Sequence, residues 1–354
     1  MYFPYFFRMF VKAAKAISPQ YTLDDRFLNG EFVDEVSPVY RAIEPDYSPL
    51  IPAGLLRRMG KAVRIGIGAG LPLLQEAGKV DGIILGTANG GLEDCVKFLN
   101  QIVEYDEGVL TPTNFVQSTP NAVAGQLALM SENTGYNATH VNGSLSFENS
   151  LIDAAMLLEE KQQTTILVGA IEEFSQYNYT IDKHAGRYRE IPVSNSQLTK
   201  HLKPGSICGE GSSMFIVSND ATDAQVEIID IAQVTSEDEK EVEATLIDFL
   251  IRNQVPADEV KTVALGRNGD ALTDHFYTAI SKRLTSIEST ICFKAYCGEY
   301  RTAAAFGLYT LFQLSKHPLL DWNGNQLHFI GNYALVYNHF DGIRHGYILV
   351  KKLR

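Results

Sequence analysis

The stretch Ala138–Leu158, ATHVNGSLSFENSLIDAAMLL, decides the fold that this sequence predicts. It reads as the end of a strand over Ala138–Val141, a tight turn at Asn142-Gly143-Ser144, and a helix over Leu145–Leu158 with apolar residues at helical spacing. A strand that leads into a helix N-terminus presents free backbone N–H groups and the positive end of the helix dipole. Because such a turn can hold a nucleophile or an oxyanion, it is a candidate functional site.

A second stretch, Ile291–Leu314 (ICFKAYCGEYRTAAAFGLYTLFQL), has the same order of elements. Residues Ile291–Ala295 predict a strand, Tyr296-Cys297-Gly298-Glu299 a turn, and Tyr300–Leu314 a helix. Each unit has a glycine in the turn before its helix. Two such units in one chain predict an internal duplication.

The rest of the chain alternates strand-like and helix-like segments, which favours an α/β fold. Phe10–Ile17 and Gly82–Thr87 predict strands, and Leu55–Ala77 predicts an amphipathic helix or a helix pair. The two halves should meet in the loop-like stretch Ser218–Ala224, so we expect domains over residues 1–220 and 221–354.

Composition excludes several classes of protein. The 354 residues are 45% hydrophobic and 20% charged, as in soluble globular proteins, and the formal net charge of −12 argues against binding to nucleic acid. No apolar run is long enough for a membrane span, and the four scattered cysteines predict neither disulfides nor zinc. We expect a cytoplasmic protein without metal or cofactor. The opening Met1–Phe10 lacks the features of a signal peptide, and Met9 is an alternative start.

Two further patterns have structural interpretations. Gly66-Ile67-Gly68-Ala69-Gly70 lacks the GxGxxG spacing of a dinucleotide site and does not follow a strand, so we interpret it as small residues in a closely packed helix. Arg57, Arg58, Lys61 and Arg64 lie at helical spacing, which is typical of a solvated helix face.

Four motifs then occur in one order: Gly86–Gly91 (GTANGG), Pro120–Gln126 (PNAVAGQ), Val168–Glu173 (VGAIEE) and Gly209-Glu210-Gly211. Together they make nearly the whole chain resemble the β-ketoacyl-acyl-carrier-protein synthases. The resemblance implies an α/β, thiolase-like fold with duplicated βαβαβ-type halves in a five-layered α-β-α-β-α arrangement.

The same resemblance implies a degenerate active site. The family uses a Cys nucleophile and two His residues, and Ser144, Gly266 and Glu299 stand at these three positions. Lys294 of the second His motif is retained. By resemblance the degenerate catalytic set is therefore Ser144, Lys294 and Glu299, with Gly266 at the lost first His. Substrate contacts are expected at Asn121, Gly298 and Asn332, the last in Gly331–Leu335, which takes the place of the closing Gly-rich loop.

These replacements predict a loss of condensing activity. Decarboxylative condensation must stabilise an enolate oxyanion, and a carboxylate at Glu299 would repel that charge. Ser144 could accept an acyl group with His140 or Lys294 as its base, or it could satisfy backbone N–H groups at the helix start. His140 is alternatively a satisfied core histidine, and Lys294 and Glu299 could form an ion pair. Cys297 is more typical of a small core residue than of a substitute nucleophile.

By resemblance, a synthase-like chain without its triad is similar to the chain-length factors of polyketide and aryl polyene pathways. In such systems a silent subunit pairs with an active ketosynthase and shapes the tunnel for the growing chain. The expected partners are an active ketosynthase, or a second copy of this chain, and an acyl carrier protein that docks on Arg57, Arg58 and Lys61. The alternative is a serine-dependent acyltransferase, thioesterase or malonyl decarboxylase that uses Ser144.

Overall fold

A computed structural model describes residues 8–110, 112–160 and 164–353 of the chain. The question of Met1 against Met9 as the start lies outside the described residues, although Met9 itself is buried at the beginning of the first strand. Of the helices in the described part of the chain, none is both long and apolar enough to cross a membrane.

Ten strands form one mixed sheet that has two five-stranded halves. The first half contains β1 (Met9–Ile17), β3 (Gly82–Gly86), β4 (Tyr136–His140), β5 (Thr165–Glu172) and β7 (Gly211–Ser218). The second half contains β8 (Val226–Thr235), β9 (Val260–Leu265), β10 (Ser289–Cys292), β13 (Tyr333–Phe340) and β14 (Arg344–Lys352). The two halves are continuous only through a short antiparallel pairing in which Met9, Phe10 and Val11 of β1 oppose Ile228, Glu227 and Val226 of β8.

The two halves have the same topology. Their strand orders are β4-β3-β5-β7-β1 and β10-β9-β13-β14-β8, so in each half the third strand along the chain lies at the free edge, followed by the second, fourth, fifth and first. The directions also agree, because the three strands nearest each free edge are parallel and the remaining two pair antiparallel. The internal duplication predicted from the two strand–turn–helix units is therefore present in the fold. The domain boundary at residue 220 falls in the loop between β7 and β8 and stays a prediction.

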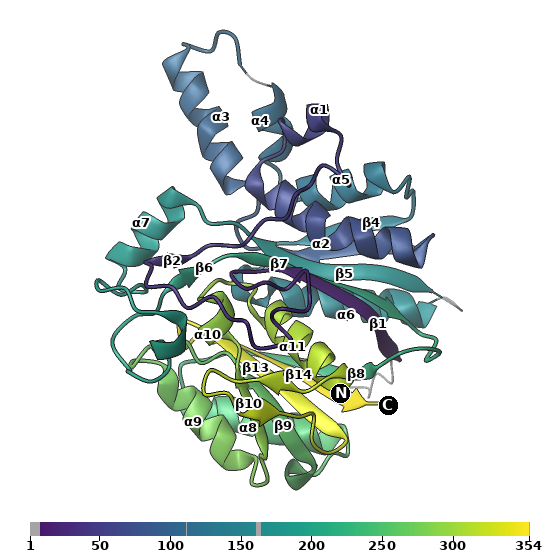
Figure 1. Ribbon diagram of the computed structural model, residues 1–354, viewed down its shortest axis with the longest axis vertical. Coiled ribbons are helices and arrows are strands. Elements are labelled where there is room, and N and C mark those ends of the chain that lie inside the picture. The colour runs from purple at the N-terminus through teal and green to yellow at the C-terminus, as the bar shows by residue number, and fades with distance from the viewer. Residues whose placement is uncertain (1–7, 111, 161–163, 354) are drawn as a thin grey trace.

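Helices cover both faces of each half and produce the expected five layers (Figure 1). The central layer consists of α6 (Ser146–Glu160) and α11 (Ala304–Lys316), whose apolar residues share one core with strands of both halves. A second core packs α2 (Lys61–Ala77) and α5 (Ala122–Met130) on the outer face of the first half. A third packs α8 (Glu239–Arg252) and α9 (Asp274–Arg283) on the outer face of the second half.

The remaining elements are short or lie at the periphery. The helices are α1 (Ala53–Leu56), α3 (Leu92–Glu104), α4 (Pro112–Gln117), α7 (Gln176–His184) and α10 (Lys294–Cys297), with 3₁₀ turns at Gly143–Leu145, Asn195–Gln197 and Ala257–Glu259. The two-stranded pairs are β2 (Val39–Tyr40) with β6 (Cys208–Gly209) and β11 (Leu319–Leu320) with β12 (Gln326–Leu327). In Figure 1, α3 and α4 project from the top of the molecule, beyond the layers.

The segment Leu55–Ala77 is a helix pair, since α1 ends at Leu56 and α2 begins at Lys61. The glycine-rich run Gly66–Gly70 lies in the buried face of α2. A Cβ at Gly70 would come within 3.1 Å of the Leu127 side chain of α5. The interpretation of these glycines as close helix packing is confirmed.

The second strand–turn–helix unit differs from its prediction. Its strand β10 ends at Cys292, and the one-turn helix α10 follows where we expected a strand as far as Ala295. Gly298 then has a φ of +76°, a conformation that favours glycine, and α11 begins only at Ala304. A Cβ at Gly298 would lie 2.8 Å from Cα of Gly209, so the close contact between these two backbones sets the shape of this turn.

Candidate functional site

Ser144 lies at the elbow between β4 and α6, as the sequence predicts. It is in the 3₁₀ turn Gly143–Leu145, in which Gly143 has a φ of +58°. The Ser144 side chain is buried, and among the described residues no group lies within hydrogen-bond distance of its Oγ.

The capping role expected for Ser144 belongs instead to Ser146. The backbone N–H of Asn142 donates to Ser146 Oγ at 2.8 Å, and that hydroxyl donates to the carbonyl of Gly143 at 2.8 Å. The prediction was wrong because the 3₁₀ turn places the second serine, not the first, against the free groups of the turn.

His140 is not placed to act as a base for Ser144. Its Nε2 lies 2.7 Å from Oδ2 of Asp153, which also accepts a hydrogen bond of 3.2 Å from the hydroxyl of Tyr136. Its side chain is 32% exposed, so the interpretation of His140 as a core histidine is also wrong. β4 is the edge strand of the sheet, and this exposes a residue that its apolar neighbours made appear buried.

Lys294 and Glu299 form the expected ion pair, and both side chains are buried. Lys294 Nζ donates to Oε2 of Glu299 at 2.8 Å and to the carbonyl of His339 at 3.0 Å. Nδ2 of Asn268 donates to the same Oε2 at 2.6 Å. Burial raises the pKa of Glu299, while the charge of Lys294 and these hydrogen bonds oppose that rise.

Gly266, at the end of β9, leaves no room for an imidazole. A Cβ built on it would contact Oδ1 of Asn338, would lie 2.9 Å from the Tyr277 hydroxyl and would lie 3.1 Å from the Phe293 ring. The space that a side chain at this position would need is therefore already filled by residues of α9, β13 and the turn after β10.

His339, near the end of β13, is a histidine in this cluster that the sequence analysis missed. Its Nε2 donates to the carbonyl of Thr273 at 3.2 Å, and its Nδ1 accepts from the backbone N–H of Gly342 at 3.3 Å. Burial and the charge of Lys294 hold the pKa of His339 well below its usual value. Both ring nitrogens of His339 are therefore engaged with the backbone.

Glu148, one turn into α6, is a second residue that the sequence analysis missed. It is buried, and burial raises its pKa to about 7. Its Oε2 has no hydrogen-bond partner among the described residues, and a Cβ on Gly346 of β14 would collide with the carboxyl group. The signal available in the sequence was a glutamate at an otherwise apolar helical spacing.

The three predicted substrate-binding residues do not form one site. Gly298 adjoins Glu299 and packs against Gly209. Asn121 is exposed before α5, where its Oδ1 accepts from the Thr139 hydroxyl at 2.7 Å. Asn332 is exposed just before β13, whereas Lys294 contacts His339 near the far end of that strand. Gly331–Leu335 leads into the strand, and the turn beside Lys294 is residues 341–343 between β13 and β14, so the structure does not bring Asn332 to the Lys294–Glu299 pair and its role in substrate binding stays a prediction.

Cys297 packs as a core residue, since its side chain is buried and burial raises the pKa of its thiol well above the usual value. Among the described residues, no group of three His, Cys, Asp or Glu side chains could hold a metal ion.

Sequence comparison assigns the chain to a known family. The family profile described as "Beta-ketoacyl synthase, N-terminal domain" matches residues 37–257, more than half of the chain. The chain belongs to the β-ketoacyl synthase family. No curated protein matches it in sequence.

Solved β-ketoacyl synthase structures share the fold at low sequence identity. The ishigamide ketosynthase/chain length factor superposes with a TM-score of 0.79 at 13% identity, covering 98% of this chain and 100% of that one. A beta-ketoacyl synthase from Burkholderia phymatum STM815 gives 0.80 at 15% identity, with 98% and 100% coverage. The ketosynthase ApeO in complex with its chain length factor ApeC from Xenorhabdus doucetiae gives 0.77 at 13% identity, with 100% coverage of both.

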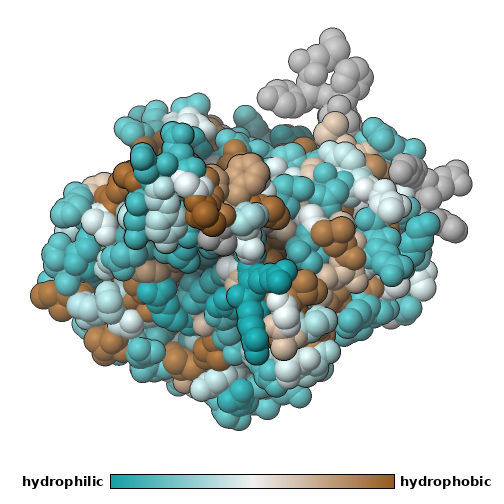
Figure 2. All heavy atoms as spheres, turned by 90° about the horizontal axis from the view of Figure 1, so that it is seen from above, coloured by the Kyte–Doolittle hydropathy of each residue, from teal (hydrophilic) through white to brown (hydrophobic). Residues whose placement is uncertain are grey.

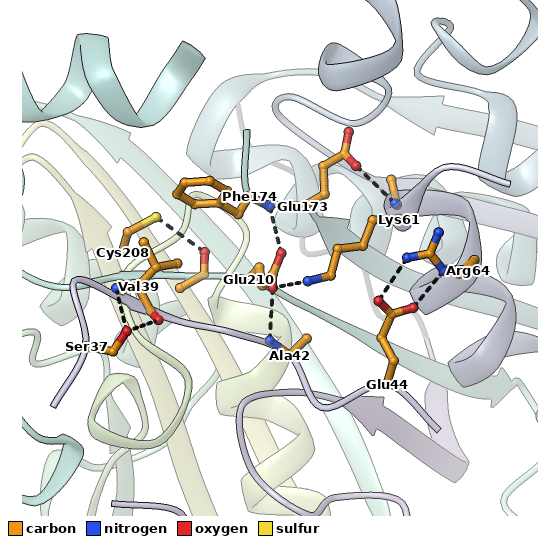
Figure 3. Close-up of polar contacts among 12 residues, drawn as sticks. Ser37, Val39, Ala42, Glu44, Lys61, Arg64, Glu173, Phe174, Cys208 and Glu210 are labelled. Atoms are coloured by element: carbon orange, nitrogen blue, oxygen red, sulfur yellow. Dashed lines mark hydrogen bonds and ion pairs between the residues drawn. The ribbon is translucent and has the colours of Figure 1, made fainter. Parts of the chain in front are cut away.

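In this β-ketoacyl synthase family member, the basic residues do not form one helix face. Arg57 and Arg58 lie in the break between α1 and α2, whereas Lys61 and Arg64 belong to α2. Lys61 forms an ion pair with buried Glu210, and Arg64 donates to Glu44 at 2.8 and 2.9 Å (Figure 3). Glu210 also accepts from the N–H groups of Ala42 and Phe174, so Lys61 completes the network around this buried carboxylate.

Arg57 and Arg58 are exposed and form no ion pair among the described residues. They border an open pocket of 410 Å³, whose lining also includes Lys61, Glu93, Asp94 and Glu173. The Glu173 carboxylate accepts from the N–H groups of Ala62 and Glu93 and so bridges the first turns of α2 and α3. Of the predicted carrier-docking residues, Lys61 is paired with Glu210, whereas Arg57 and Arg58 are exposed and have no ion-pair partner among the described residues.

Proposed function

We propose that this chain is a catalytically silent β-ketoacyl synthase-like subunit that pairs with an active ketosynthase and shapes the tunnel for the growing acyl chain. The buried ion pair between Lys294 and Glu299 carries the proposal. It fills one expected histidine position with a carboxylate, and the packing of Asn338, Tyr277 and Phe293 closes the other at Gly266. Neither position offers a donor to a developing enolate oxyanion.

Ser144, at the position expected for the family's Cys nucleophile, supports the same proposal. A serine hydroxyl is a weak nucleophile that needs a positioned base, and no described side chain lies within hydrogen-bond distance of Ser144 Oγ. His140 is paired with Asp153, and Lys294 with Glu299.

An exposed apolar surface supports the pairing. Eleven of the 21 exposed large apolar residues among the described residues lie between Leu99 and Met156, on or beside α3, α4, α5, β4 and α6. They are Leu99, Val103, Tyr105, Val109, Phe115, Val116, Leu129, Tyr136, Val141, Ile152 and Met156. We call this set the partner face. Figure 2 looks at the end from which α3 and α4 project and shows apolar side chains exposed among polar ones. Exposed apolar surface of this extent is typical of an interaction site.

Carrier-protein docking is the second part of the proposal. Arg57 and Arg58 provide the local positive charge that an acidic carrier protein would need against the overall charge of −12.

The test is the intact mass of the purified chain after incubation with acetyl-, malonyl- and longer acyl-carrier proteins. We expect no adduct and no decarboxylation by the chain alone. A mass increase that maps to Ser144 and disappears in Ser144→Ala would overturn the proposal.

That outcome would favour the alternative of a serine-dependent acyltransferase, thioesterase or malonyl decarboxylase. The one observation in its favour is the position of Ser144 at a helix start with an unpartnered hydroxyl. Glu148 does not supply the missing base, because no hydrogen bond joins it to Ser144 in the described structure.

A further inference from the structure

The partner face combines apolar side chains with an unpaired sheet edge. β4 pairs with β3 on one side, and no described strand pairs with its other side. Tyr136 and Val141, at the two ends of this strand, are 45% and 53% exposed. An open edge beside exposed apolar residues is suited to association with another chain, and the charge of the face decides which chain fits.

The segment that carries the partner face is strongly acidic. From Phe98 to Glu160 the sequence contains eight Asp or Glu and no Lys or Arg, a formal charge of −8 out of the −12 of the whole chain. Glu148 is buried, which leaves seven acidic residues that are at least partly exposed: Glu104, Asp106, Glu107, Glu132, Asp153, Glu159 and Glu160. Within the segment His140 is paired with Asp153, and from another element Arg344 of β14 donates to the Asn142 carbonyl at 3.0 Å, so the acidic residues still outnumber the basic groups.

This charge opposes self-association through the face. A symmetric dimer brings the same surface of two copies together, so each copy would meet an acidic face with an acidic face. Like charges across an interface repel, and the repulsion weakens as salt shortens the Debye length from about 30 Å at 0.01 M to about 8 Å at 0.15 M. The apolar residues favour association, but the acidic residues around them disfavour a second copy of this chain.

We propose that the partner face selects a different protein, one whose matching surface is apolar at its centre and carries Lys and Arg at its rim. The inference rests on the proposed function and adds the chemistry of the partner. The acidic face attracts the basic partner, and the repulsion between two such faces disfavours a dimer of two silent subunits.

The first measurement is sedimentation velocity of the purified full chain at 50 mM and 500 mM NaCl. We expect a monomer at low salt and an increasing dimer fraction at high salt. The neutralised variant E104Q/D106N/E107Q/E132Q/E159Q/E160Q should dimerise at 50 mM NaCl at least tenfold more tightly than wild type. A matched control, E31Q/E35Q/E190Q/E237Q/D258N/E259Q, changes the same number of exposed acids outside the partner face. It should remain monomeric.

The second measurement tests whether a basic version of the partner face binds the acidic one. A variant with Lys at Glu104, Asp106, Glu107, Glu132, Glu159 and Glu160 is mixed with an equal amount of wild type. We expect a one-to-one dimer at 50 mM NaCl that weakens as salt increases. Either of two results would overturn the inference: a wild-type dimer that is stable at low salt, or failure of both the neutralised and the mixed samples to associate.

These results are distinguishable from failure of the proposed function. A stable wild-type homodimer without any acyl adduct would contradict the partner chemistry and leave the subunit catalytically silent. An adduct at Ser144 would contradict the proposed silence, whatever the oligomeric state.

Discussion

Lys294 Nζ lies 2.8 Å from Oε2 of Glu299, and both side chains are buried. The pair lies where the resemblance to β-ketoacyl synthases places a lysine and a histidine. The two charges compensate each other inside the core. The predictions below test this centre and the elements around it.

Removing one member of the ion pair should lower the free energy of unfolding. Glu299→Ala leaves Lys294 as an unpaired buried cation, and we expect a loss of about 3–5 kcal/mol in the free energy of unfolding. The double variant Lys294→Met/Glu299→Leu should lose much less, because it removes both charges. Urea unfolding of the three proteins measures this, and equal losses for the single and double variants would contradict it.

Glu148 should make stability depend on pH. Burial raises its pKa in the folded protein to about 7, above the value near 4.5 of a free glutamate. The folded state therefore binds the proton more tightly, and this contribution to stability is present below pH 4.5 and lost as pH rises through 7. Glu148→Gln mimics the protonated form, so its stability relative to wild type should rise by about 2.5 kcal/mol between pH 5 and pH 8. Chemical unfolding at both pH values checks this. Substitution of the exposed Glu31 by Gln is the control. A stability difference between Glu148→Gln and wild type that does not change with pH would contradict the prediction.

Restoring histidine at Gly266 should not restore the family's chemistry. Because Asn338, Tyr277 and Phe293 fill the space, Gly266→His should cost about 1–3 kcal/mol by overpacking. The combined variant S144C/G266H/E299H should release no CO₂ from malonyl-carrier protein. The measurements are thermal unfolding and CO₂ release, and decarboxylation by the combined variant would show that the site can still adopt the active geometry.

Ser144 and Ser146 should contribute differently to stability. Ser146→Ala removes the hydroxyl that both accepts from Asn142 and donates to Gly143, and we expect a loss of about 1–2 kcal/mol. Ser144→Ala removes a hydroxyl without a partner and should change stability by less than about 0.5 kcal/mol. Denaturant unfolding of the matched pair is the measurement. A larger loss for Ser144→Ala would mean that its Oγ has a structural role.

Carrier docking should depend on the two available arginines. Arg57→Glu/Arg58→Glu should weaken binding of an acyl carrier protein about tenfold at low salt, with a smaller effect at high salt. The control Lys240→Glu/Lys282→Glu changes exposed lysines on α8 and α9, on the opposite outer layer. Isothermal titration calorimetry compares the variants. Equal weakening in both would indicate an effect of net charge, not of docking.

Some local predictions failed where tertiary contacts override the sequence pattern. His140 appeared to be a core residue because its strand was expected to be buried, but β4 is an edge strand and exposes it. Ser144 appeared to cap the helix, but the 3₁₀ turn gives that role to Ser146. Asn332 was placed at the site by the resemblance of Gly331–Leu335 to the closing Gly-rich loop, and the structure shows that this segment leads into an eight-residue strand.

The sequence by itself determined the α/β class, the duplicated strand–turn–helix units and the position of the first strand–helix elbow. These follow from local periodicity, whereas the replacement of catalytic residues by Ser144, Gly266 and Glu299 stays what the family resemblance implies. Only the tertiary structure decided that Lys294 neutralises Glu299, that Gly266 is closed by Asn338 and Tyr277, and that Glu148 is buried without a partner. Such relationships join residues from different layers, so they depend on the packing of the two halves and not on spacing along the chain.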